Sequence, residues 1–286
     1  MIDSFLITSR ETLEASLVVG IVLAYLNKTD NQNYKKTVYY GVIFGILASI
    51  LTAIVFTAVA GDFEGAGEKI FEGVTMLLGT FLLTTMIFWM MKQRHIAKEI
   101  ESKVESHIKN SQPLFSHAGI FLLVGIAIIR EGVETVIFLN AINFASGMNF
   151  IGGLLGIITA IIVGYLFFIG FKKINLKKLF NASSILLILF AAGLTSHGVH
   201  ELEDAKLLSG IITPIWNLNP PVNSDGSFPI LHENGLIGSF LKGLFGYNGN
   251  PSLIEVIAYF GYLAVIFLLW KIVEKTKIER VSGTYS

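Results

Sequence analysis

The sequence contains no cysteine, and only 15% of its residues are charged. The absence of cysteine excludes disulfides, thiolate metal sites, iron–sulfur clusters and cysteine nucleophiles. Soluble domains carry about 25% charged residues, so this chain has too few for an ordinary soluble globule. Its 21 basic and 21 acidic residues cancel, and no net field therefore favours nucleic acid as a partner.

Apolar residues make up most of what is present. They account for 53% of the 286 residues, and the mean hydropathy is +0.66. A bilayer core about 30 Å thick requires about 20 apolar residues per helix. Seven stretches meet this requirement: roughly 4–26, 38–60, 70–91, 117–140, 151–171, 179–197 and 252–272. The sequence therefore predicts an all-α, multi-pass integral membrane protein with membrane lipid around its seven spans.

The distribution of lysine and arginine predicts how these spans are oriented. Sixteen of them lie on the side reached after spans one, three, five and seven, and three lie on the other side. Basic residues accumulate on the cytoplasmic side, so we expect the N-terminus outside and the C-terminus in the cytoplasm. Eleven acidic residues lie on the outer side. They either form a vestibule that concentrates cations or simply follow from the basic bias.

The whole chain is expected to form one transmembrane domain, without a soluble domain at either end. The first span lacks the basic leading segment of a signal peptide and carries charges in its apolar stretch, so it is kept as a span. The linker is charged at helical spacing, which predicts a solvated helix. The expected parts are repeat one (1–91), a cytoplasmic linker (92–116), repeat two (117–197), an external loop (198–251), the last span (252–272) and a cytoplasmic tail (273–286).

A charged motif occurs twice inside these spans. Residues 10–14 read RETLE in span one, and residues 130–134 read REGVE in span four, 120 residues later. The offset is three spans, and an odd number of spans makes the second copy run antiparallel to the first. The sequence thus predicts a 3+3 inverted repeat plus one extra helix, an architecture found in secondary transporters.

The cost of charge in lipid predicts where these side chains lie. One charged residue at the bilayer centre costs about 2.5–3.5 kcal/mol, so six facing lipid would cost roughly 15–20 kcal/mol. This exceeds the total stability of many domains, about 5–15 kcal/mol. On a helix, Glu11 and Glu14 share one face, and so do Glu131 and Glu134. We therefore expect the four carboxylates to face one another or water.

Four carboxylates without a neighbouring histidine, cysteine or methionine suit a hard, multivalent cation. With Arg10 and Arg130 charged, the six groups sum to −2, which a divalent ion neutralises and a trivalent ion over-compensates. We interpret the arginines as charge partners that compete with the ion and so allow its release. The alternative is that two salt bridges merely clamp the helices, although a buried pair is weak evidence for stability.

A second candidate group follows span six. If that helix continues, its polar residues pair at i,i+4 spacing and offer mixed nitrogen and oxygen ligands suited to iron or zinc. A metal entrance or gating role is one interpretation, and a polar helix end that meets water is the other. The group comprises His197, His200, Glu201, Glu203 and Asp204.

Two further features precede or lie within the spans. Glu68 and Glu72 precede span three, where they either face the ion path or simply complement the helix dipole. The pairs of glycines spaced four apart at 41 and 45, and at 152 and 156, allow close helix approach and are expected to be packing sites.

The R-E-x-x-E motif in span one, repeated in span four of a seven-span chain, resembles the high-affinity iron permeases, which comprise the fungal ferric permease and its bacterial relatives. Four other stretches also resemble the bacterial branch: 71–73 (FEG), 86–90 (MIFWM), 198–203 (GVHELE) and 243–249 (GLFGYNG). The resemblance implies that each motif binds ferric iron in passage. It also implies import across the plasma membrane and an external oxidase or iron-binding protein as partner. Iron is then the transported ion, and no cofactor is bound permanently.

Two alternatives use the same residues. A divalent-metal or proton-coupled cation transporter would employ the same carboxylates. A membrane-embedded di-iron oxidase would make the chain an enzyme, but ferritin-like sites use Glu-x-x-His, which is absent from these spans.

Overall fold

The computed structural model describes residues 1–92, 96–109, 113–147, 149–168, 176–209 and 212–282. In this part of the chain all regular structure is helical, which confirms the all-α prediction. The helices are α1 (Ile2–Lys28), η1 (Gln32–Tyr34), α2 (Lys35–Gly61), α3 (Ala66–Lys92), α4 (Ile96–Lys109), α5 (Pro113–Ser146), α6 (Phe150–Phe168), α7 (Leu176–Asp204), α8 (Leu236–Phe245) and α9 (Leu253–Ser282).

Among the described residues, four helical segments are apolar and long enough to cross a membrane by length and composition, and they lie in η1–α2, α3, α7 and α9. Helices α1 and α5 are as long, with 27 and 34 residues, but they carry the charged motifs. Helix α6 has 19 residues and is strongly apolar. The chain is thus a helical membrane protein, and its seven-span topology stays a prediction.

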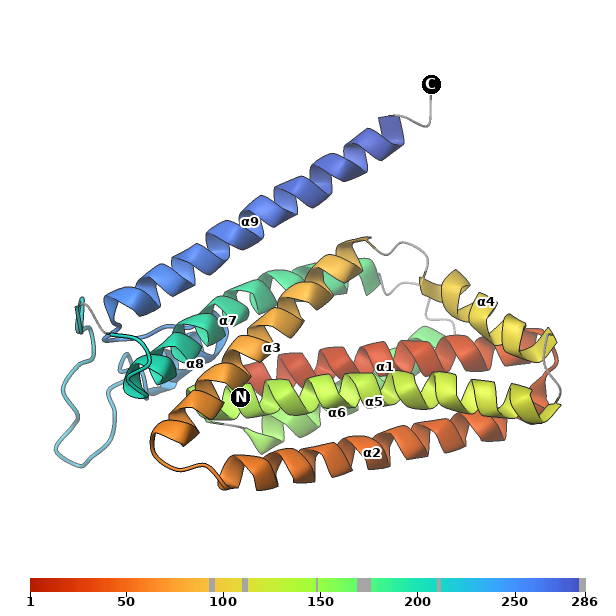
Figure 1. Ribbon diagram of the computed structural model, residues 1–286, viewed down its shortest axis with the longest axis horizontal. Coiled ribbons are helices and arrows are strands. Elements are labelled where there is room, and N and C mark those ends of the chain that lie inside the picture. The colour runs from red at the N-terminus through yellow and green to blue at the C-terminus, as the bar shows by residue number, and fades with distance from the viewer. Residues whose placement is uncertain (93–95, 110–112, 148, 169–175, 210–211, 283–286) are drawn as a thin grey trace.

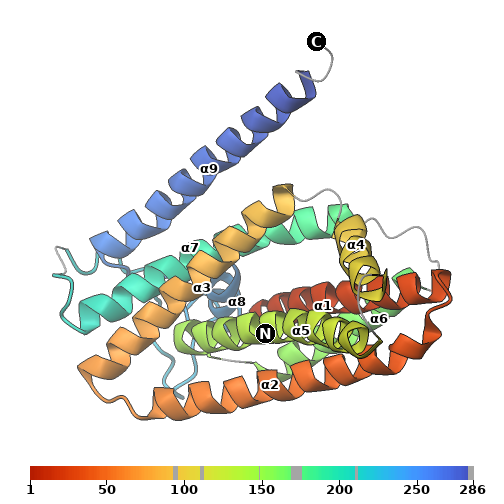
Figure 2. The same cartoon turned by 45° about the vertical axis from the view of Figure 1, so that its right-hand side comes forward.

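The long helices pack in two parallel pairs and one crossed, antiparallel pair (Figures 1 and 2). Helix α1 lies along α6, α2 lies along α5, and α3 crosses α7. At the first two interfaces glycine brings backbones together. A Cβ on Gly41 would lie 2.9 Å from the carbonyl oxygen of Phe121, and one on Gly156 would lie 2.6 Å from that of Phe5. Both predicted glycine pairs are therefore packing sites.

The linker helix α4 is not solvated on every side. It carries Ile100, Val104 and Ile108 at four-residue spacing, and Val104 is fully buried. These side chains join an apolar cluster with Val22 and Leu26 of α1. A solvated helix was expected here, and the helix is present but not fully solvated. Apolar residues at this spacing lie on a single face of the helix, and that face packs on the bundle.

Several boundaries differ from the expected ones. Helix α7 continues to Asp204, so the stretch expected to be an external loop begins with two helical turns and also contains α8. Helix α9 extends ten residues past the expected end of the last span. Residues 169–171 of the fifth expected span and 283–286 of the expected tail lie outside the described residues.

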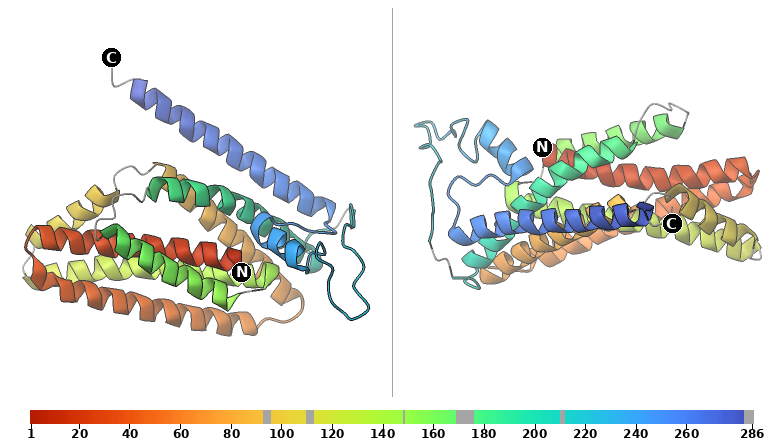
Figure 3. Two further views of the ribbon diagram at one scale, coloured as in Figure 1. Left: turned by 180° about the vertical axis from the view of Figure 1, so that it is seen from behind. Right: turned by 90° about the horizontal axis from the view of Figure 1, so that it is seen from above.

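Helix α9 stands apart from the bundle along much of its length (Figure 3). It contacts α7 chiefly and α3 to a small extent. Side chains such as Phe260, Phe267 and Leu268 are exposed. An apolar surface of this kind suits contact with lipid chains, which are as apolar as leucine.

Candidate functional site

The two charged motifs lie where α1 meets α5. Glu11 of α1 and both Glu131 and Glu134 of α5 each offer a carboxylate oxygen, and these three oxygens lie within 4.8 Å of one another. All three residues are buried, and Glu11 is only 1% exposed. The helical spacing puts the two glutamates of α5 on one face, and the α1–α5 contact brings Glu11 to them.

Each arginine pairs with the second glutamate of its own motif. Arg10 Nε lies 3.2 Å from Glu14 Oε1, and Arg130 Nε lies 2.9 Å from Glu134 Oε1. Arg130 Nε is also 4.0 Å from Glu131 Oε1. Glu14 therefore lies beside Arg10, one helical turn from Glu11, and is not a member of the three-carboxylate group.

Several oxygens of this group have no hydrogen-bond partner among the described residues. They are both side-chain oxygens of Glu11, Oε2 of Glu131 and Oε2 of Glu134. Burying a carboxylate without a partner costs several kcal/mol. A bound cation would offset this cost, and oxygen ligands of this kind suit hard cations. The arrangement is therefore chemically suited to bind a multivalent cation between α1 and α5.

Trp89 of α3 adds a contact on one side of this site. The guanidinium carbon of Arg130 lies 5.2 Å from the centroid of the Trp89 ring, and both side chains are partly exposed to the surface. This contact is a cation–π interaction. It joins the second motif to α3.

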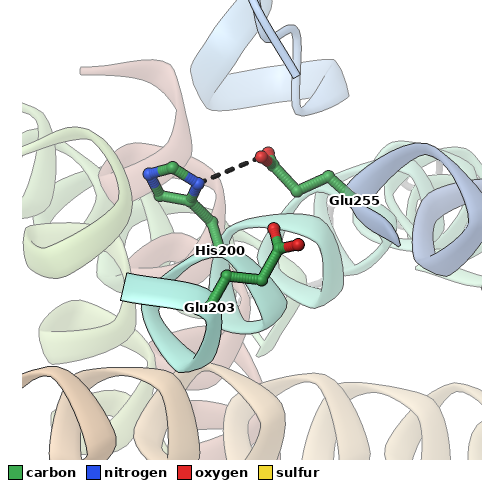
Figure 4. Close-up of side chains that lie close together, drawn as sticks. All are labelled: His200, Glu203 and Glu255. Atoms are coloured by element: carbon green, nitrogen blue, oxygen red, sulfur yellow. Dashed lines mark hydrogen bonds and ion pairs between the residues drawn. The ribbon is translucent and has the colours of Figure 1, made fainter. Parts of the chain in front are cut away.

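A second polar group forms where α7 meets α9 (Figure 4). His200 Nδ1 lies 3.0 Å from Glu255 Oε1, and ligand atoms of His200, Glu203 and Glu255 lie within 4.8 Å of one another. Asn248 Nδ2 donates to Glu255 Oε2 at 2.7 Å, and Ser252 N donates to Glu255 Oε1 at 3.1 Å. The Ser252 hydroxyl donates to Glu203 Oε2. The polar stretch at the end of α7 is thus joined to α9.

The other histidine-cluster residues have different surroundings. His200 Nε2 lies 3.8 Å from Asp204 Oδ2, and Asp204 is exposed. His197 is 8% exposed, and its Nε2 is buried without a partner among the described residues. Glu201 Oε2 instead pairs with Lys69 Nζ of α3 at 2.8 Å.

The two acidic candidates of α3, Glu68 and Glu72, have different surroundings. Glu72 Oε2 lies 3.5 Å from Lys69 Nζ, so Lys69 bridges Glu72 to Glu201 of α7. Glu68 stays exposed on the helix surface. Of these two, Glu72 alone joins the contact between α3 and α7.

Sequence reasoning missed Glu255 and Lys69 as candidate site residues. Glu255 counted only as one outer acid among eleven, although an acidic residue at the start of an apolar span is a signal in itself. Lys69 was used only in the count of basic residues that predicts the orientation of the spans. Its role depends on how α3 meets α7, which no local pattern reveals.

Comparison with known proteins identifies the family of the chain. The model of one protein family, described as the Iron permease FTR1 family, matches residues 1–277. The chain belongs to this family. The resemblance expected from the paired motifs is thereby confirmed, and this FTR1-family chain is a membrane transporter of iron.

Similarity to individual relatives extends over nearly the whole length of this FTR1-family chain. The ferrous iron permease EfeU of Yersinia pestis is 31% identical over 275 residues, which span 94% of this chain and 93% of the relative. The ferrous iron permease EfeU of Escherichia coli O6:K15:H31 (strain 536 / UPEC) is 30% identical over 269 residues, or 92% of each chain. No solved structure matches the chain.

Proposed function

We propose that this chain imports iron across the plasma membrane along a path that passes the carboxylates of both motifs. The observation that carries the proposal is the buried group of Glu11, Glu131 and Glu134, whose ligand oxygens lie within 4.8 Å of one another. Four oxygens of this group have no hydrogen-bond partner among the described residues. A transported cation would supply what they lack.

Helix packing supports the proposed 3+3 inverted repeat. In such a repeat, α1, α2 and α3 correspond to α5, α6 and α7. The pairing of α1 with α6 then corresponds to that of α5 with α2, and the α3–α7 and α1–α5 pairs each join equivalent helices. The motif site lies at the α1–α5 contact, as expected for a transporter whose site lies between its repeats. With the N-terminus outside, the α7–α9 group lies on the outer side.

The two arginines serve release in this proposal. Arg10 forms an ion pair with Glu14, and Arg130 forms one with Glu134. An arriving cation competes with these pairs, and the arginines compete with the cation in turn. Affinity is thereby limited, so that the ion is able to leave.

The oxidation state of the iron divides the proposal into two forms. The family resemblance predicts ferric iron supplied by an external oxidase or iron-binding protein. Ferrous iron is the second form, favoured by the net charge of −2 over the six motif residues. The relatives compared above are themselves named ferrous iron permeases.

The deciding experiment is uptake of radioactive iron by proteoliposomes that contain the purified chain. Ferrous iron with a reductant and chelated ferric iron are supplied in separate reactions. Wild type is compared with Glu14→Ala and Glu134→Ala, with the exposed Glu68→Ala as the matched carboxylate control. We expect both motif variants to lose uptake of whichever form the wild type accepts, and the control to retain it. Uptake unaffected by either motif substitution contradicts the proposal.

A further inference from the structure

We infer that His200, Glu203 and Glu255 form a second metal site, which binds a divalent transition-metal ion where α7 meets α9 (Figure 4). The inference deepens the proposed function and rests on it in one respect, namely that the ion bound there in the cell is iron on its way to the motif carboxylates. Binding of a divalent metal at the site does not depend on that function.

The three side chains converge from two helices. His200 and Glu203 are three residues apart on α7 and therefore share a face. Glu255 lies in the first turn of α9, and its side chain is 1% exposed. Figure 4 shows the Glu255 carboxylate directed at the His200 ring, with Glu203 beside them.

Neighbouring groups hold the two carboxylates in place. Asn248 Nδ2 donates to Glu255 Oε2, and the backbone N–H of Ser252 donates to Glu255 Oε1. The Ser252 hydroxyl binds Glu203 Oε2. Metal ligands in proteins are oriented by hydrogen bonds of this kind, which are worth about 10- to 100-fold in metal affinity.

An unpaired oxygen points independently to a missing ligand. Glu203 Oε1 is buried and has no hydrogen-bond partner among the described residues, even though Oε2 of the same carboxylate is paired. A metal ion at the site would bind the free oxygen of Glu203.

The donor set defines the class of ion. One imidazole nitrogen with carboxylate oxygens suits iron, zinc and similar first-row ions better than calcium or magnesium. A metal ion that displaces the imidazole proton leaves two carboxylates and a neutral imidazole, whose summed charge of −2 a divalent ion neutralises. The α1–α5 group differs because its motifs contain no histidine. The two sites are therefore distinguishable by nitrogen coordination.

The experiment uses Mn²⁺ as a paramagnetic probe on the full chain purified in detergent. Electron spin-echo spectroscopy detects the ¹⁴N coupling of a coordinated imidazole, which an oxygen-only motif site does not produce. We expect this coupling in wild type and its loss in His200→Gln. We also expect Glu203→Gln and Asn248→Ala to weaken Mn²⁺ binding at this site by about tenfold or more. His107→Gln and Glu68→Gln are the matched controls and should leave both readouts unchanged.

Absence of the ¹⁴N coupling in wild type, or its persistence in His200→Gln, overturns the inference. If His200→Gln fails to fold, unchanged Mn²⁺ affinity in both folded Glu203→Gln and folded Asn248→Ala overturns it instead. Glu134→Ala separates the two proposals. We expect this variant to keep the ¹⁴N coupling while losing iron uptake. Retained uptake in this variant would refute the motif pathway and leave the α7–α9 site standing.

Discussion

In the first copy of the motif, on α1, the arginine side chain is 2% exposed, whereas in the second copy, on α5, it is 46% exposed. Both arginines make the same pair with the glutamate four residues later. Arg10 is enclosed within the protein, while Arg130 lies against the partly exposed ring of Trp89. Two copies of one sequence pattern thus differ in how far their arginines are exposed at the protein surface, and we expect the Arg130 side to be the more open side of the site.

The largest expected difference between the two copies is in stability. Removing one partner of a buried ion pair costs about 3–5 kcal/mol, because it leaves a buried charge uncompensated. Arg10→Ala is expected to lose this much. Arg130→Ala also leaves buried Glu134 uncompensated, but it is expected to lose less, because the Arg130 side chain is 46% exposed and so has fewer buried contacts to lose. Unfolding of both variants in detergent without metal measures the difference, and equal losses would remove the proposed asymmetry.

The helix interfaces beside the two motifs are expected to behave alike. A Cβ on Gly45 of α2 would lie 2.5 Å from Ile128 Cβ of α5, and one on Gly156 of α6 would lie 2.6 Å from the carbonyl oxygen of Phe5. Gly45→Ala and Gly156→Ala should each lose about 1–3 kcal/mol through overpacking. Gly261→Ala is the control, because a Cβ there has no neighbour within 4 Å among the described residues. Unfolding measurements that show loss at Gly45 alone would contradict the equivalence of the two interfaces.

Substitution of the two arginines is also expected to affect metal affinity and ion release differently, although this difference is smaller than the differences in stability. Replacing Arg10 with glutamine changes the summed charge of the two motifs from −2 to −3. It also removes a cation that competes with the metal ion for the carboxylates. We expect about tenfold tighter metal binding, or ~1.4 kcal/mol, together with slower transport. Arg130→Gln should have a weaker effect because the Arg130 side chain is 46% exposed, whereas that of Arg10 is 2% exposed. Metal titration and proteoliposome uptake measure both quantities, and unchanged transport in Arg10→Gln would exclude the release role.

The smallest effect is expected at Trp89. Trp89→Ala removes the cation–π contact with Arg130, which at an exposed site is worth about 0.5–1 kcal/mol. Trp89→Phe keeps an aromatic ring and should retain part of the cation–π stabilisation. The difference should vanish when both are made in an Arg130→Ala background. A difference that persists there would mean that Trp89 acts through packing.

Much of the motif site follows from local rules, and the α7–α9 group does not. The cost of charge in lipid predicts that the two motifs turn inward, and helical spacing predicts which glutamates share a face. The same reasoning expected Glu14 beside the other three carboxylates; in the structure Glu14 pairs with Arg10 and is not one of the three residues whose ligand oxygens lie within 4.8 Å of one another. Glu255 escaped notice because its partner His200 is 55 residues away and the two meet only through packing.

The sequence by itself determined the all-helical membrane fold, the family and the pair of charged motifs, because span length, apolar composition and burial cost are properties of each segment. Only the tertiary structure decided that Glu11 meets Glu131 and Glu134 and that Glu255 reaches α7. It also decided that the Arg130 side chain is partly exposed whereas that of Arg10 is buried. These outcomes depend on how helices rotate and cross one another. That geometry is set by glycine contacts and side-chain packing between segments far apart in the chain.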